Sequence, residues 1–282
     1  MMRFLQLGRF LGKFVRRRPV VALLIAVFGA LGLWVGPMVR TLYRSTGQFV
    51  PWPAEPHVKY EPGAEAMAAE VVAALPGAIL TVEEQLHQRF LLPPTVFVCA
   101  TLTTYGSYGG SPTSGGYVIN GRLFLSPKPA NTSERIPRLL AHELTHLHVE
   151  QHIGMVRAMR LPFWFSEGLA VLVSSGGGAE NTAEEEARRA IVEGRVFVPD
   201  GRVGLLGRKV PSSFGLPPHL FYREAAIFLG HVMQGDANRF RDFLQRVEDQ
   251  RPIGTAFEAV YGETLTAAWD GFVATVKASS SS

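Results

Sequence analysis

The chain has 282 residues, with 28 basic and 24 acidic side chains and a single cysteine. The excess of basic charge lies in the first 44 residues, which carry eight Lys or Arg and no acid. The remaining chain has a balance of −4. The high isoelectric point therefore comes from the first 44 residues alone, and we predict no nucleic-acid partner. Because Cys99 is alone, an intrachain disulfide is excluded, and a domain of this size can be stable without one.

The amino-terminal residues have the pattern of a membrane anchor. Residues 1–18 are basic, and residues 19–39 are 21 uncharged residues, enough to cross a hydrocarbon core about 30 Å thick. A cleaved signal peptide is the alternative, but its apolar core is usually only about 7–15 residues, and Ala30-Leu31-Gly32 is a poor cleavage site. We predict a single-pass anchor with a cytoplasmic amino end and an extracytoplasmic domain, which is periplasmic if the source is bacterial.

The rest of the chain divides into a spacer, one domain and a tail. The Pro-rich stretch at residues 40–62 predicts a stiff spacer that lifts the domain off the bilayer. Residues 63–277 predict one α+β domain, and residues 278–282 a disordered tail. Within the domain, apolar runs at residues 95–101 and 122–126 predict strands. The Gly- and Ser-rich stretch between them, residues 104–116, lacks the G-K-[ST] of a phosphate-binding loop.

A helix is predicted from residue 133 to about residue 152, because candidate N-caps precede it and apolar residues recur at helical spacing. The motif His142-Glu143-Leu144-Thr145-His146 lies in its middle. Residues four apart share a face, so both histidines can bind one ion, and Glu143 can reach a metal-bound water. A catalytic zinc site needs a third protein ligand, and Glu167, 21 residues after His146, is the best candidate. The alternative is an ordinary amphipathic helix.

Together with Trp164-Phe165-Ser166-Glu167-Gly168-Leu169-Ala170, this motif resembles the gluzincin metallopeptidases, and specifically the peptidase-MA-like proteins with HExxH and W-x-x-E-G-x-A helices. The resemblance covers roughly residues 62–277 and is specific at the two motifs. It implies a thermolysin-like fold, with a small sheet and a zinc helix followed by a helical lobe. It also implies Zn²⁺ bound by His142, His146 and Glu167, with Glu143 as general base.

The chain departs from the thermolysin pattern at one position. Members of that type carry an Asp four residues after the ligand glutamate, and here that residue is Val171. Another group, or a backbone carbonyl, must then orient the histidine.

His152 and Glu150 are rival third ligands. His152 occupies the last position of the metzincin pattern H-E-x-x-H-x-x-G-x-x-H, but Val149 replaces the glycine that would turn the chain. Glu150 shares the face of the two histidines but lies a further turn along, too far to converge on a tetrahedral ion. We therefore interpret His148, Glu150 and His152 as the solvated end of the helix.

The resemblance also implies roles for a tyrosine and two segments. Tyr222 begins a run similar to one in aminopeptidase-N-like gluzincins, whose tyrosine stabilises the oxyanion; the alternative is a tyrosine that packs its helix. The exopeptidase motif G-x-M-E-N is absent, which argues against an aminopeptidase. Residues 122–126 become a candidate edge strand of the cleft, and residues 104–116 either a mobile flap or a plain surface loop.

The carboxy-terminal part of the domain predicts helices at residues 182–193, 218–233, 236–247, 255–261 and 263–276. We predict a membrane-anchored zinc metallopeptidase, an endopeptidase acting on peptide or protein substrates through a zinc-activated water. The alternative is an inactive gluzincin-like domain that serves as a zinc-stabilised binding or scaffolding module at the membrane. The intact Glu143 favours catalysis, because a purely structural site has no use for it.

Overall fold

The computed structural model describes residues 39–127, 135–201, 208–249 and 251–280. The chain separates into two compact units, Met1–Thr46 and Gly47–Ser282. Apart from Val39, the predicted anchor at residues 19–39 lies outside the described residues. Among the described residues, the second unit contains every strand, and it also contains every residue of the predicted metal site.

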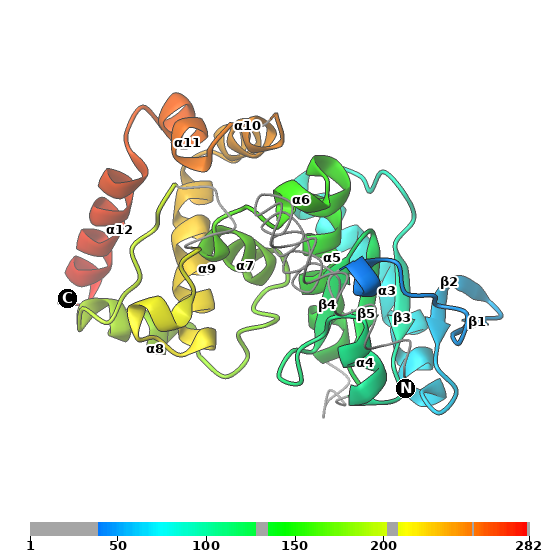
Figure 1. Cartoon of the computed structure of the whole chain (residues 1–282). Helices are drawn as coiled ribbons and strands as arrows, with labels where there is room; N and C mark the ends of the chain where they lie inside the picture. Colours follow the sequence, from blue (N-terminus) through cyan, green and yellow to red (C-terminus); the bar gives the residue numbers. More distant parts are fainter. Residues whose placement is uncertain (1–38, 128–134, 202–207, 250, 281–282) are drawn as a thin grey trace, which may run out of the picture. The chain divides into compact units, whose positions relative to one another are not determined.

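The second unit is an α+β fold in which a mixed five-stranded sheet precedes a helical lobe (Figure 1). The strands are β1 (Val50–Trp52), β2 (Glu55–Tyr60), β3 (Thr95–Val98), β4 (Gly116–Ile119) and β5 (Arg122–Leu125). Their order across the sheet is β1-β2-β3-β5-β4. The three central strands run parallel, whereas β1 and β4 pair antiparallel with their neighbours and form the two edges.

Two predictions about the strands are wrong. Residues 50–60 are not a spacer, because they form the β1–β2 hairpin, in which Val58 is fully buried and pairs with Val96 of β3. Pro51 is tolerated because β1 is an edge strand, where one missing N–H need not break a ladder on both sides. Nor are residues 122–126 an edge strand, because β5 lies between β3 and β4.

The Gly- and Ser-rich stretch is more ordered than a flap or a plain loop. It contains most of α4 (Leu102–Ser107), which begins after Thr101, whose hydroxyl accepts a hydrogen bond from the Thr104 amide. It ends at Gly116, the first residue of β4. Tyr105 is fully buried, and its hydroxyl lies 2.7 Å from that of Ser114, so the turn between α4 and β4 is tied to the helix.

Two long helices pack beside the sheet, α3 (Glu65–Leu86) and α5 (Arg135–Ile153), and they also contact each other. Among the described residues, α3 is the one helix long and apolar enough to cross a membrane. Its buried residues recur every three or four positions and belong to the same core as α5 and the sheet, as in a core helix. The helix predicted at residues 133–152 is confirmed by α5, which begins two residues later.

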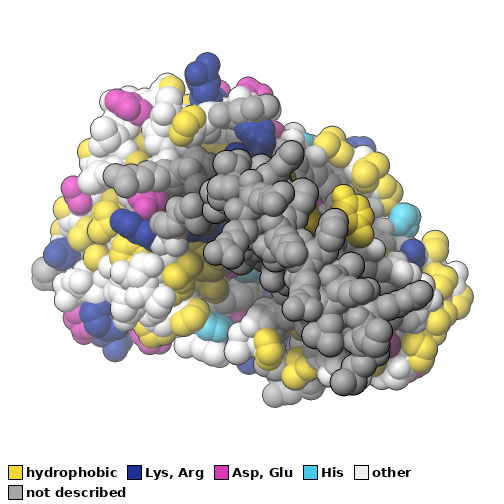
Figure 2. All heavy atoms as spheres, in the orientation of Figure 1, with side chains coloured by type: hydrophobic (Ala, Val, Ile, Leu, Met, Phe, Trp, Pro, Cys, Tyr) yellow, Lys and Arg dark blue, Asp and Glu magenta, His cyan; other side chains and the backbone are white. Residues whose placement is uncertain are grey.

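The helical lobe follows, and its predicted helices are confirmed with small shifts at their ends. It comprises α6 (Met155–Ala158), α7 (Phe163–Val173), α8 (Glu184–Val192), a 3₁₀ turn (Pro211–Phe214), α9 (Pro218–Gly235), α10 (Ala237–Glu248), α11 (Ile253–Tyr261) and α12 (Leu265–Ser279). Trp164 and Phe228 bring α7 and α9 together, with ring centroids 5.9 Å apart. Because α12 runs to Ser279, the predicted tail begins inside a helix. On the described part of the face in Figure 2, hydrophobic side chains are scattered among polar ones.

Glu224 of α9 is a fully buried carboxyl and predicts a pH-dependent stability. One of its oxygens accepts a 3.3 Å hydrogen bond from the Phe197 amide, and the other has no hydrogen-bond partner among the described residues. Burial raises its pKa from 4.5 to about 8. The unfolded chain therefore loses this proton at lower pH than the folded chain, so the free energy of unfolding should fall as pH rises from about 4.5 to about 8.

Glu224→Gln should remove most of this decline, because an amide does not ionise. Urea unfolding at pH 5 and pH 8 measures the difference, and Glu185→Gln, at an exposed position of α8, is the matched control. An identical pH dependence in wild type and Glu224→Gln would contradict the assignment.

Candidate metal centre

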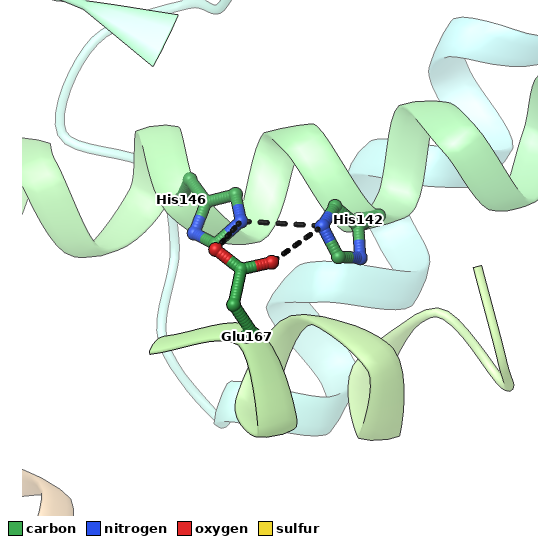
Figure 3. Close-up of side chains that lie close together, drawn as sticks. All are labelled: His142, His146 and Glu167. Carbon is green, nitrogen blue, oxygen red and sulfur yellow. Dashed lines mark hydrogen bonds and ion pairs between the residues drawn. The ribbon is translucent and has the colours of Figure 1, made fainter. Parts of the chain in front are cut away.

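Two helices bring the three predicted ligands together (Figure 3). His142 and His146 lie one turn apart on α5, and Glu167 lies on α7, which packs against α5. The Nε2 atoms of the two histidines are 3.2 Å apart. The Glu167 carboxylate reaches both, with Oε2 3.5 Å from His142 Nε2 and Oε1 3.8 Å from His146 Nε2.

These separations suit one shared ion. A tetrahedral zinc with ligand bonds of about 2.0–2.2 Å holds its ligand atoms roughly 3.3 Å apart. The three donor atoms all lie within 4.8 Å of one another, and two imidazoles with one carboxylate are the ligand set of one class of catalytic zinc site. His142, His146 and Glu167 therefore form a group that can hold a metal ion.

The charges of the three side chains depend on one another. Burial raises the pKa of Glu167, but His146 and His142 outweigh it, so this pKa is lower than usual and the carboxylate stays ionised. Burial lowers the pKa of His146 to about 4. Burial also lowers that of His142, but its hydrogen bond to Glu167 and the nearby carboxylates raise it to about 9. His142 must therefore lose a proton to bind a metal ion, which makes metal affinity pH-dependent.

Each histidine has a second partner behind it. His142 Nδ1 lies 2.9 Å from the Gly177 carbonyl, which can only accept, so Nδ1 carries the hydrogen and Nε2 faces the ion. His146 Nδ1 lies 3.3 Å from the hydroxyl of Ser166, the residue before Glu167. The site therefore does not need an acidic residue at position 171, where the chain has Val171. The Gly177 carbonyl orients His142 instead, which is one of the two solutions predicted from the sequence.

The loop that carries Gly177 also closes around the ring of His142. Gly178 has φ +80°, and a Cβ there would lie 2.5 Å from His142 Cε1, closer than any side chain can approach. None of the sequence motifs described above marks this loop as part of the site. The signal that could have found it is the run of three glycines at residues 176–178, about ten residues after Glu167.

Glu143 lies beside the metal group and against the edge of the sheet. It is 7% exposed, and a Cβ on Gly116 would come within 2.4 Å of its Cγ. The first residue of β4 therefore packs on Glu143, and a larger residue there would displace the Glu143 side chain. Burial, which is the largest cause, raises the pKa of Glu143 to about 7; His142 lowers it and Glu167 raises it further. A carboxyl with this pKa can accept and release a proton near neutral pH.

Two further polar side chains respond to the charges of the site. Tyr222 of α9 is half-buried; burial, and then the charges of Glu167 and Glu143, raise its pKa. Arg208 lies over the Phe163 ring, with its guanidinium carbon 4.9 Å from the ring centroid. Burial lowers the pKa of Arg208, and Glu167 and Tyr222 raise it. No sequence motif marks Arg208, and its place beside the site comes from the tertiary structure.

The interpretation of the end of α5 as solvated is wrong. His148 and Glu150 are 1% and 9% exposed, because this end of α5 packs against the end of α3 and the β4–β5 turn. His148 and His152 each place Nε2 3.1 Å from a backbone carbonyl, that of Gln88 and that of Arg89 respectively. Glu150 accepts a hydrogen bond from the Gly121 amide. His152 and Glu150 therefore have structural partners, and neither belongs to the metal group, as predicted.

No protein-family model, curated protein or solved structure matches this chain. The metal group therefore rests on the geometry of its own residues, and the likeness to gluzincins remains a resemblance at two motifs.

Proposed function

We propose that this protein is a membrane-anchored zinc metallopeptidase of the gluzincin type that cleaves within peptide chains outside the cytoplasm. The observation that carries the proposal is the convergence of His142, His146 and Glu167 with a buried, non-ligating Glu143 beside them. A site that only stabilises a fold would commonly use four protein ligands and would need no such carboxyl.

Zinc, when bound, lowers the pKa of a water and polarises the scissile carbonyl. Glu143 accepts a proton in the attack and returns it to the leaving amine, which its pKa of about 7 permits. Tyr222 donates a hydrogen bond to the developing oxyanion, in keeping with its electrostatic coupling to Glu143 and Glu167. The substrate backbone pairs with β4, which is the edge strand next to Glu143.

The test uses the full chain purified in detergent. It should contain about one zinc per chain and cleave a mixed peptide library, and a chelator should abolish the cleavage until zinc is restored. A zinc-loaded chain that cleaves nothing would favour a zinc-stabilised binding or scaffolding module. A chain that takes up no zinc would contradict both functions.

Gly116→Ala should lower kcat/KM for peptide hydrolysis by roughly 10–100-fold with zinc retained, because the added methyl group displaces Glu143 and a misplacement of about 1 Å can cost about 10²-fold. Gly106→Ala in α4 is the control, since a Cβ there meets no atom within 4 Å. Steady-state kinetics and metal analysis measure the effect. Full activity in Gly116→Ala would argue against the close packing of β4 on Glu143.

The membrane part of the proposal predicts that the full chain resists extraction by alkaline carbonate, because an uncleaved apolar span stays in the bilayer. Protease should reach residues beyond Arg44 only from the extracytoplasmic side. Fractionation and immunoblotting measure both. A soluble secreted form that begins near Leu33 would show instead that the apolar run is a cleaved signal.

A further inference from the structure

The loop that orients His142 consists largely of glycine and other small residues. Residues 176–179 are Gly-Gly-Gly-Ala, so hardly any side chain of their own can hold the Gly177 carbonyl in place. One internal contact comes from Ser174 at the end of α7, whose hydroxyl donates to Gly177 at 3.3 Å, but the same hydroxyl lies closer to the Ala170 carbonyl, at 2.6 Å. Within the loop, the Gly178 amide also donates to the Glu180 carboxylate at 2.9 Å and the Ala179 amide to the Gly176 carbonyl at 3.2 Å, and Gly177 packs on the backbone of α5 at Arg138. A further tie comes from another element of the helical lobe.

That element is α9, through Arg223. Its Nε donates to the Thr182 carbonyl at 3.0 Å, and its Nη2 donates to the Ala179 carbonyl at 3.0 Å and to the Gly176 carbonyl at 3.5 Å. The planar guanidinium of Arg223 thus contacts the loop of residues 176–182 at both ends, at Gly176 and at Thr182. The contact is tight, because Gly176 has φ +101° and a Cβ there would lie 2.8 Å from Arg223 Nη1.

The chain of contacts leads from Arg223 to the metal group. Arg223 holds Gly176 and Ala179, and the intervening Gly177 and Gly178 contact His142 through the carbonyl and through close packing on the ring. The adjacent residue on α9 is Tyr222, which responds to the charges of the same site. The helix α9 also packs closely on α7, which carries Glu167. It therefore contacts both the loop behind His142 and the helix that supplies Glu167.

We infer that Arg223 is a positioning residue of the metal centre: it holds the loop of residues 176–182 so that the Gly177 carbonyl fixes the ring and the tautomer of His142. The inference rests on the proposed zinc site. Groups that orient a metal-bound histidine typically change metal affinity by about 10–100-fold when they are lost. Without Arg223, the glycine loop gains conformational freedom, and His142 must be ordered anew each time zinc binds.

The test is zinc titration of the metal-free full chain in detergent, in competition with a chromophoric chelator. Arg223→Met should weaken zinc binding by roughly 10–100-fold. The zinc affinity of Arg223→Lys should lie between those of Arg223→Met and wild type, because an ammonium group can donate to one carbonyl but lacks the planar guanidinium that contacts several. The absorption spectrum of the Co²⁺-loaded chain should change in both variants, since it reports the geometry of the ligands.

Arg239→Met is the matched control. Arg239 also donates to a backbone carbonyl, that of Val260 at 2.7 Å, and it lies over the Tyr261 ring in α11, but it contacts neither the loop nor the metal group. Arg239→Met should lower thermal stability of the metal-free chain as Arg223→Met does, yet bind zinc as wild type does.

The possible outcomes are separable. Wild-type zinc affinity in Arg223→Met, or equal weakening in Arg239→Met, would overturn the positioning role. If Arg223→Met does not fold, Arg223→Lys decides, and zinc binding equal to wild type would overturn the role. Failure of the wild-type chain to bind zinc would instead refute the proposed function itself.

Discussion

Glu143→Gln is expected to abolish peptide hydrolysis while leaving zinc bound. Glutamine has nearly the same shape, so it fits the buried position against Gly116, where Glu143 is 7% exposed. Its amide cannot accept the proton that the reaction requires, and loss of a positioned general base costs on the order of 10²–10⁴-fold in rate. The three candidate ligand atoms belong to His142, His146 and Glu167, so metal content should stay at the wild-type level.

The measurements are kcat/KM on the best peptide of the library and zinc by elemental analysis. Glu150→Gln is the matched control, because Glu150 is also buried on α5, and an amide oxygen can still accept the hydrogen bond from the Gly121 amide. This control should keep both zinc and activity. An active Glu143→Gln variant would show that another group takes the proton, and the proposed mechanism would fail.

Glu167→Ala should abolish zinc binding or weaken it strongly. The loss of affinity should exceed the ~10–100-fold that is typical when a residue that only orients a metal ligand is removed. The substitution removes the anionic ligand and leaves two histidines from a single helix. The pKa of Glu167 is lowered by His146 and His142, so at neutral pH the side chain presents the ionised form that binds a cation. Hydrolysis should disappear with the metal.

His152→Ala separates this assignment from the metzincin plan. His152 contacts the Arg89 carbonyl and the Gln88 side chain at the end of α3, so its loss should cost about 1–3 kcal/mol of stability. Zinc content should not change, because α5 continues to Ile153 and carries His152 away from the ion. Zinc kept by Glu167→Ala but lost from His152→Ala would overturn the gluzincin-type assignment.

Local periodicity is enough to predict much of the metal group. The spacing of His142 and His146 places both on one face of any α-helix, because the backbone repeats every 3.6 residues whatever surrounds it. The same argument excludes His152, since a helix that continues past Val149 leads away from the ion. The helices of the carboxy-terminal lobe follow from apolar spacing in the same way, and α5 and α9 begin within two residues of their predicted starts.

Long-range packing decides the rest. The order β3-β5-β4, which makes β4 and not β5 the edge beside Glu143, depends on which strands pair, and no short stretch of sequence encodes it. Residues 50–60 have the composition of a Pro-rich spacer, and only the pairing of β2 with β3 shows that they belong to the sheet.

The polar partners of the metal group show the same division between local and long-range information. Helical spacing places His142, but the acceptor behind it is the backbone carbonyl of Gly177, 35 residues away, and a carbonyl carries no mark in the sequence. Likewise, no motif marks Arg208 or Arg223. Arg208 lies over the Phe163 ring of α7, and Arg223 reaches the Thr182 carbonyl from α9, and both contacts join segments far apart in the sequence. The sequence by itself therefore determines the ligands that lie on one helix and the residue types that can complete the site. Only the tertiary structure decides what orients them, because those contacts join segments that local periodicity cannot relate.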